Sequence, residues 1–277
     1  MRLYDQAIKL YSDSIKIKND FWPSLFNRGL VFYEIGHFQK SYNDFEKAYK
    51  IQSNNHQIVF SLGSALEQLK DINNAKIYYE TTIKLDSNFE PAYLSLADLQ
   101  VKLNMFDDAL ITLENLLKLN SKNYKAIYNK GNILEKKGNL NEAIKCFKLA
   151  VNINPELYQG FVNLGTLMQR ENKNFEYSIS CFKKAIEINP KHDQAFSNYS
   201  ALLSKLGDFN EAYKKANEAI KINKNNARAY YNRAIALSGL GYLYEAVENY
   251  NSAITLDPNF IDNYYNKSLD NLLLGFF

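Results

Sequence analysis

The hydrophobic residues of the chain recur with a period of 34 residues. The stretch "FVNLGTLMQRENKNFEYSISCFKKAIEINP" (161–190) and the stretch "YYNRAIALSGLGYLYEAVENYNSAITLDP" (230–258) carry the same pattern. Apolar residues concentrate at repeat positions 4, 7 and 11 and at positions 21, 24, 28 and 30, a spacing that predicts two amphipathic helices per repeat. Full repeats fall at 22–55, 56–89, 90–123, 124–157, 158–192, 193–226 and 227–260.

Glycine and proline residues mark the boundaries of these helices. Position 15 carries glycine in several repeats, where a left-handed residue ends a first helix, and every proline lies at a repeat boundary. The fifth repeat has one extra residue within "RENKNF", and later positions in it are counted without that residue. The same period predicts a second helix alone in 1–21 and a first helix alone in 261–277. The last segment ends in "LLLGFF", so we expect uncapped ends that could support self-association.

The composition narrows the classes of function. The chain has 277 residues and a net charge of +3, with 33 basic and 30 acidic residues in no basic stripe, which disfavours a nucleic-acid partner. No apolar run approaches the roughly 20 residues that span a bilayer, so no membrane partner is expected. Cys146 and Cys181 have no metal-ligand spacing, and the three histidines have no evident nucleophile beside them. We therefore expect no cofactor, no metal, no catalytic residue, and a cytoplasmic or nuclear location.

The repeat motif resembles that of the tetratricopeptide repeat family. The motif has Leu-Gly at positions 7 and 8, Ala at 20, an aromatic residue at 24, Ala at 27 and Pro at 32. Single repeats lack some of these residues, and most lack Pro at 32, but the pattern stays in phase over essentially the whole chain. The resemblance implies an all-α fold, a right-handed α-solenoid, formed as a single array over 1–277. It further implies that the first helices line a concave groove that binds protein partners.

Asparagine recurs at position 6 of the first helix, about 150° away from the packing face. Six of the eight first helices carry it, although asparagine accounts for only 35 of 277 residues: Asn27, Asn129, Asn163, Asn198, Asn232 and Asn266. A solvated polar face would explain the row. The superhelical domain of O-linked N-acetylglucosamine transferases, which the array resembles, instead implies an asparagine ladder that grips the backbone of an extended peptide. A side-chain amide offers both a donor and an acceptor to one peptide unit.

Neighbouring positions complete the predicted groove. Tyr128, Tyr231 and Tyr265 stand at position 5, and Lys125 and Arg228 stand at position 2. These tyrosines either contact a ligand or fold against the adjacent helix. Groove charges change from acidic residues such as Glu67 and Asp98 to basic residues such as Lys136 and Lys205, which predicts that an acidic segment prefers the C-terminal half.

Two functions follow from this pattern. The first is a non-enzymatic scaffold that binds extended peptide segments of a partner protein. The alternative is the substrate-recognition array of a larger O-linked N-acetylglucosamine transferase-like enzyme whose catalytic domain is absent here. A receptor for chaperone tails is disfavoured, because no repeat has lysine at position 5.

Overall fold

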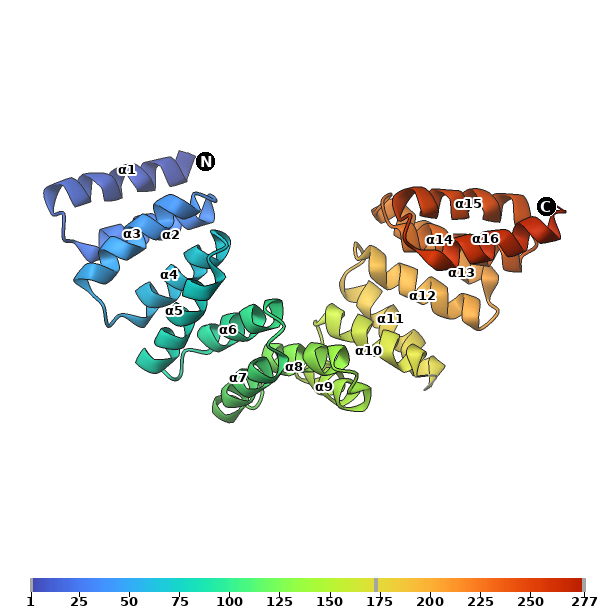
Figure 1. The fold of residues 1–277 in the computed structure, drawn as a ribbon, viewed down its shortest axis with the longest axis horizontal. Coiled ribbons are helices and arrows are strands. Elements are labelled where there is room, and N and C mark those ends of the chain that lie inside the picture. The colour runs from blue at the N-terminus through green and yellow to red at the C-terminus, as the bar shows by residue number, and fades with distance from the viewer. Residues whose placement is uncertain (1, 172–173, 276–277) are drawn as a thin grey trace. The chain divides into compact units, whose positions relative to one another are not determined.

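The chain folds into a succession of α-helices, seen in a computed structural model that describes residues 2–171 and 174–275. These residues form sixteen helices and no strand (Figure 1). The all-α solenoid class expected from the period is confirmed.

First and second helices alternate along the chain. The first helices are α2 (Trp22–Glu34), α4 (His56–Gln68), α6 (Glu90–Lys102), α8 (Tyr124–Lys136), α10 (Tyr158–Arg170), α12 (Asp193–Lys205), α14 (Ala227–Gly239) and α16 (Ile261–Leu273). The second helices are α1 (Arg2–Ile17), α3 (Phe38–Ile51), α5 (Ile72–Leu85), α7 (Phe106–Leu119), α9 (Leu140–Ile153), α11 (Phe175–Ile188), α13 (Phe209–Ile222) and α15 (Leu243–Leu256).

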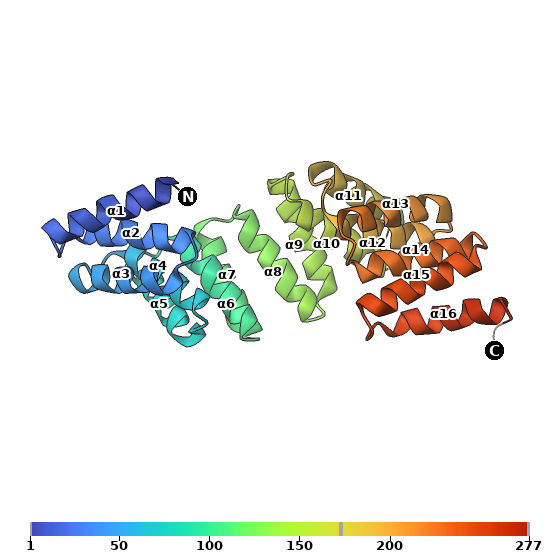
Figure 2. The same ribbon diagram turned by 90° about the horizontal axis from the view of Figure 1, so that it is seen from above.

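The helices group into two compact units, 1–137 and 138–277. The division falls between α8 and α9, inside the repeat expected at 124–157. Within a unit, a first helix packs against the second helices before and after it. Figure 2 shows the converse for α15, a second helix that lies between the first helices α14 and α16 in the second unit.

In the six full repeats whose turns are completely described, position 15 holds a residue with a positive φ angle. Gly207 has a φ of 83° there, as the position-15 pattern predicts, but Lys70 and Asn104 occupy the same place with φ angles of 67° and 59°. A lysine in this left-handed region is strained, because its Cβ approaches the following carbonyl oxygen. The turn is therefore set by the packing of its two helices even where glycine is missing.

The core repeats one contact, between a large ring at position 24 and a small residue at position 8. A Cβ added to Gly29 would lie 2.6 Å from the fully buried ring of Phe45. A Cβ added to Gly165 would lie 2.9 Å from the fully buried ring of Phe182. The glycines at position 8 thus allow the two helices of a repeat to approach closely.

Asparagine has a structural role in the turns between repeats. The side-chain oxygen of Asn223, at position 31, accepts a hydrogen bond of 3.0 Å from the backbone N–H of Asn225. Asn226 caps the following helix by accepting from the N–H of Ala229 at 3.0 Å. Both asparagines also donate to Oδ2 of Asp193, each at 2.8 Å, and so hold the turn against α12.

Position 7 differs from the expectation that it is apolar. Arg28 donates from Nε and Nη2 to the two carboxylate oxygens of Asp44, both at 2.7 Å, and from Nη1 to Ser12 at 2.9 Å. Arg233 occupies the same place in α14 and donates to Asn249 at 2.6 Å and to Asn217. An arginine at position 7 can thus bond to the second helices on both sides of it, and Lys130 and Lys267 are two further exceptions to the apolar pattern at this position.

Candidate functional site

All the predicted site residues lie on first helices, but they are divided between the two units. Asn27 lies on α2; Lys125, Tyr128 and Asn129 on α8; Asn163 on α10; Asn198 on α12; Arg228, Tyr231 and Asn232 on α14; and Tyr265 and Asn266 on α16. The residues on α2 and α8 belong to the first unit and the others to the second. The face of α12, α14 and α16 that carries Asn198, Asn232 and Asn266 is called the first-helix face below.

Asn232 is the most buried member of the row, with 8% of its surface exposed. Its Nδ2 donates to the backbone carbonyl oxygen of Ser197 at 2.8 Å and to the hydroxyl of the same residue at 3.1 Å. A carbonyl oxygen only accepts hydrogen bonds, so the amide must turn its nitrogen towards α12. The Oδ1 atom of Asn232 then points away from Ser197.

Asn198 and Asn266 repeat this orientation. Nδ2 of Asn198 lies 3.0 Å from Oγ1 of Thr166. Thr166 gives its single proton to the carbonyl oxygen of Val162 at 2.8 Å, so it accepts from Asn198. Nδ2 of Asn266 donates to the Tyr231 hydroxyl at 2.7 Å. Each of the three amides therefore ties its helix to the first helix before it.

These bonds change the chemistry expected for the row. A free amide would pair with both groups of a peptide unit, but the Asn232 nitrogen already donates to Ser197. Among the described residues, no hydrogen bond to the Oδ1 atoms of Asn198, Asn232 and Asn266 is recorded. Asn232 therefore offers a ligand its oxygen, whereas Asn198 and Asn266 each offer an oxygen and a second N–H proton.

The remaining asparagines of the row differ from these three. Asn27 and Asn129 are half-buried, and the part of the chain that the structure describes contains no hydrogen bond to their side chains. Asn163 is half-buried on α10 and has an interaction partner. The helix-tying bond is thus described for Asn198, Asn232 and Asn266, which the sequence pattern alone did not distinguish from the rest of the row.

The two tyrosines of the first-helix face have different roles. The ring of Tyr231 lies 4.7 Å from the ring of Phe260 and 6.0 Å from that of Tyr250, measured between centroids. Burial raises the pKa of the Tyr231 phenol. Tyr265 is 64% exposed, and the charged Arg228 is exposed as well. Tyr231 is a packing residue, whereas Tyr265 and Arg228 are accessible to a ligand.

Several charges that the sequence places in the groove are engaged within the fold. Nζ of Lys136 lies 6.0 Å from the ring centroid of Phe106, and Lys205 makes the equivalent contact with Phe175 at 5.1 Å. These contacts join a lysine at position 13 to the aromatic residue that begins the preceding second helix. Sequence reasoning missed them, although the pairing of position 13 with position 17 of the previous repeat is a signal that could have shown them.

The acidic part of the predicted charge trend is also compensated. Glu67 accepts a hydrogen bond from the Tyr79 hydroxyl at 2.7 Å and from Lys102 at 2.7 Å. Lys102 also pairs with Asp98 at 2.7 Å. The negative field of these first-unit residues is therefore weaker than a count of charges suggests.

The described residues contain neither a metal-binding group of side chains nor a membrane-spanning helix. In 2–171 and 174–275, no three His, Cys, Asp or Glu side chains are grouped so that they could hold a metal ion. None of the helices described in these ranges is long and apolar enough to cross a membrane. Cys181 is buried, and this burial raises its pKa to about 11.

Family models match most of the chain. A model of the tetratricopeptide repeat protein 21 C-terminal ARM domain matches residues 29–160. One tetratricopeptide repeat model matches residues 158–192 and 227–260, and another matches 181–214. Together they cover 29–214 and 227–260. None of the curated proteins matches the chain in sequence.

Solved structures are similar to the chain in fold. YrrB, described as a TPR protein with an unusual peptide-binding site, is 22% identical with a TM-score of 0.57, and the match covers 69% of this chain and 97% of YrrB. A tetratricopeptide repeat protein from Parabacteroides merdae is 16% identical with a TM-score of 0.65, over 90% of this chain and 98% of that one. The APC/C hetero-tetramer Cut9–Hcn1 gives 14% identity and a TM-score of 0.70, over 96% of this chain and 52% of that one.

Proposed function

Because the chain belongs to the tetratricopeptide repeat family, we propose that it is a non-catalytic scaffold that binds an extended segment of a partner protein on the first-helix face. The peptide-binding site named for YrrB supports this class of ligand. The same face would serve the alternative drawn from the sequence, the recognition array of a transferase. Transfer of a sugar to the bound peptide would distinguish the two.

The observation that carries the proposal is the common orientation of Asn198, Asn232 and Asn266. Their nitrogens donate to the preceding helix, which leaves a row of oxygens for a ligand. Successive repeats are about 10 Å apart, and an extended chain rises about 3.3 Å per residue. About every third residue of a peptide would therefore place its N–H opposite one oxygen, and each such bond contributes about 0.5–1.5 kcal/mol.

Exposed side chains beside the row would supply selectivity. A hydrogen bond to the peptide backbone forms whatever the side chain of that peptide residue, so it gives no sequence selectivity. Tyr265 offers an exposed ring on α16, and Arg228 offers a positive charge at the beginning of α14. We expect these two residues to select peptides with an apolar and an acidic side chain at matching places.

Peptide selection on the purified chain tests this proposal. Random dodecapeptides displayed on phage are selected, and the enriched peptides are then synthesised and titrated by fluorescence anisotropy. We expect the double variant Tyr265→Ala, Arg228→Ala to weaken the main class of peptides about tenfold, because it removes a ring contact and a charge contact. Tyr242→Ala is the matched control, since Tyr242 is 55% exposed at the start of α15 and away from the row.

Two results would contradict the proposal. If every selected peptide binds the double variant and the wild type alike, the first-helix face is not the peptide site. Equal weakening by Tyr242→Ala would indicate a general effect of removing exposed tyrosines, and it would count against the proposal too.

A further inference from the structure

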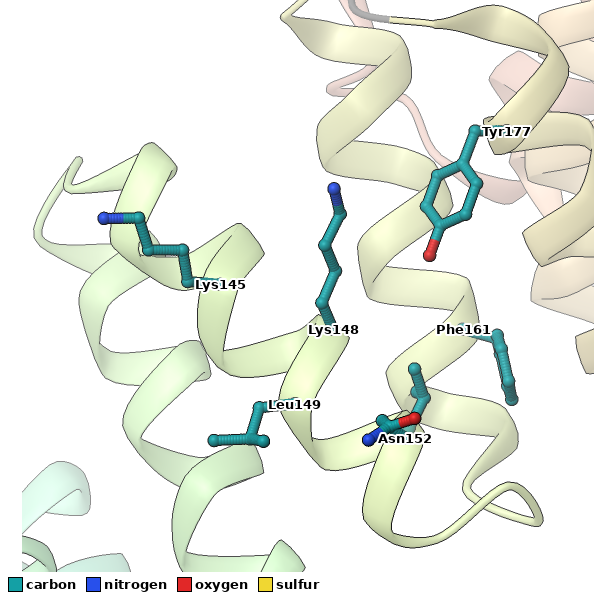
Figure 3. Close-up of a pocket in the computed structure, with 7 residues that line it drawn as sticks. Lys145, Lys148, Leu149, Asn152, Phe161 and Tyr177 are labelled. Atoms are coloured by element: carbon teal, nitrogen blue, oxygen red, sulfur yellow. The ribbon is translucent and has the colours of Figure 1, made fainter.

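A depression of about 710 Å³ opens on the second unit, between α9, α10 and α11. Helix α9 contributes Lys145, Lys148, Leu149 and Asn152, α10 contributes Phe161, and α11 contributes Tyr177 (Figure 3). We call it the α9–α11 depression. Its volume lies within the range of about 300–1,000 Å³ that is typical of ligand sites.

The other repeats show which residues of this depression the fold requires. Leu149 stands at position 26 and is 48% exposed. At that position all six other full repeats carry a polar residue: Lys47, Thr81, Asn115, Lys184, Glu218 and Ser252. The array therefore folds without an apolar side chain at this place, and Leu149 adds exposed apolar surface that packing does not explain.

The charges at the depression also differ from those at the same positions of several other repeats. Position 25 is acidic in three repeats, with Glu46, Glu80 and Glu114, but carries Lys148 here. Position 19 is acidic in four repeats, with Asp108, Glu142, Glu211 and Glu245, but carries Tyr177 here. A cation, Lys148, and an aromatic ring, Tyr177, thus stand at two positions that are commonly acidic in the other repeats.

The cation and the ring lie together in the structure. Nζ of Lys148 is 5.3 Å from the centroid of the Tyr177 ring, and Figure 3 shows the two side chains facing each other between α9 and α11. Lys145 adds a second positive charge and pairs with Glu142 at 2.7 Å on the exposed side of α9. Such an exposed pair contributes little, so a ligand carboxylate could compete for Lys145. The local field is positive beside an apolar wall.

The floor of the depression is fixed by close packing. A Cβ added to Gly160 would lie 2.7 Å from Cγ1 of Val151, so α9 and α10 approach more closely here than an alanine would allow. Alanine is the commonest residue at this position in the other repeats: Ala92, Ala126, Ala195 and Ala229. Because the floor is packed, the shape of the depression is largely preformed before a ligand arrives.

We propose that the α9–α11 depression binds an acidic segment of a partner protein that carries one large apolar side chain. The carboxylates of the segment pair with Lys148 and Lys145, and the apolar side chain packs against Leu149 and Phe161. This site is separate from the first-helix face, since it is built mainly by second helices. A single chain thus holds two peptide sites, which variants at different residues distinguish.

Variants taken from the other repeats test the site without disturbing the fold. Leu149→Lys introduces the residue found at the same position as Lys47 and Lys184, and Lys148→Glu introduces the residue found as Glu80 and Glu114. Lys183→Glu is the matched control, because Lys183 is the exposed position-25 residue of the next repeat and does not line the depression. Circular dichroism and thermal unfolding verify that each variant is folded.

The probe is the phage-displayed library of random dodecapeptides, selected on the whole chain. We expect a class of peptides that is rich in Asp and Glu around one large apolar residue. Members of this class should bind Leu149→Lys and Lys148→Glu about tenfold more weakly, because burial of one apolar side chain or one charge contact is of that order. Binding to Lys183→Glu and to the Tyr265→Ala, Arg228→Ala double variant should not change.

Three results would overturn the proposal. The first is a selection that yields no peptides weakened by Leu149→Lys. The second is equal weakening by Lys183→Glu, which would indicate general attraction to positive charge. The third is a weakened class with no excess of acidic residues. Peptides that lose binding only to the Tyr265→Ala, Arg228→Ala variant belong to the first-helix face, so the two proposals can fail separately.

Discussion

The substitution Asn232→Asp tests whether the row of asparagines ties the first helices together. Asn232 donates from Nδ2 to the carbonyl oxygen of Ser197 at 2.8 Å, and the residue is 8% exposed. Aspartate has the same shape, but it places an oxygen where the nitrogen was. Two acceptors, one of them charged, would then face each other with little water between them.

The free energy of unfolding that Asn232→Asp loses follows from the lost hydrogen bond and from the uncompensated charge. Loss of the neutral hydrogen bond costs about 1 kcal/mol, the amount expected for Asn232→Ala. A buried charge without a partner raises the total to about 3 kcal/mol or more. Asn198→Asp is the matched control, because the Thr166 hydroxyl can rotate and donate to the new carboxylate. We expect this variant to lose less than about 1 kcal/mol.

Urea unfolding followed by circular dichroism measures these differences. The carboxyl at 232 would have a raised pKa in the folded state, so its penalty should be present above the unfolded value of about 3.9 and vanish below it. A protonated carboxyl donates to Ser197 and restores the bond. If Asn232→Asp is as stable as the wild type at pH 7, or no less stable than Asn198→Asp, the row is a solvated face and the bonding scheme is refuted.

Three further outcomes follow from the structure. Lys70→Gly should raise the melting temperature, with a gain of about 1 kcal/mol, because Lys70 holds a φ of 67°; an unchanged or lower melting temperature would contradict the strain. Burial raises the pKa of Asp270, whose Oδ2 has no hydrogen-bond partner among the described residues, so the wild type loses stability as pH rises through that pKa. Asp270→Asn should therefore melt higher at pH 7 and no higher below about pH 3.9, and a gain independent of pH would speak against this cause. The pKa of about 11 at Cys181 predicts that, in a Cys146→Ser variant, iodoacetamide labels the protein at pH 7.5 only after unfolding; rapid labelling of the native variant would disprove it.

The succession of helices could be predicted from the sequence because packing imposes the period directly. Each ring at position 24 needs a small residue opposite it, and pairs such as Phe45 with Gly29 recur with the 34-residue spacing. The turn at Gly207 was predictable for a different reason, because glycine adopts a φ of 83° without strain. The turns at Lys70 and Asn104 could not be predicted in this way, because they have the same positive φ without a glycine.

The contacts of the candidate site could be predicted only in part. The period placed Asn232 off the packing face, but its bond to Ser197 joins position 6 to position 5 of the previous repeat. A hydropathy pattern gives no such pairing, because it describes one helix at a time. Arg28 and Asp44 were missed for a similar reason: each looks like an exposed charge until the partner is found.

The bonds within the row constrain which ligands it can hold. A peptide N–H that donates to the Asn232 oxygen extends a chain of hydrogen bonds through the amide to Ser197, and bonds in such a chain strengthen one another. A ligand that accepts from the Asn232 nitrogen would have to displace a bond to Ser197 on α12, at a cost of about 1 kcal/mol, because both acceptors of that nitrogen belong to Ser197. A peptide that donates to the Asn232 oxygen therefore binds without disturbing the junction between α12 and α14. Because such a peptide binds the folded chain, it should raise the unfolding temperature in proportion to its affinity.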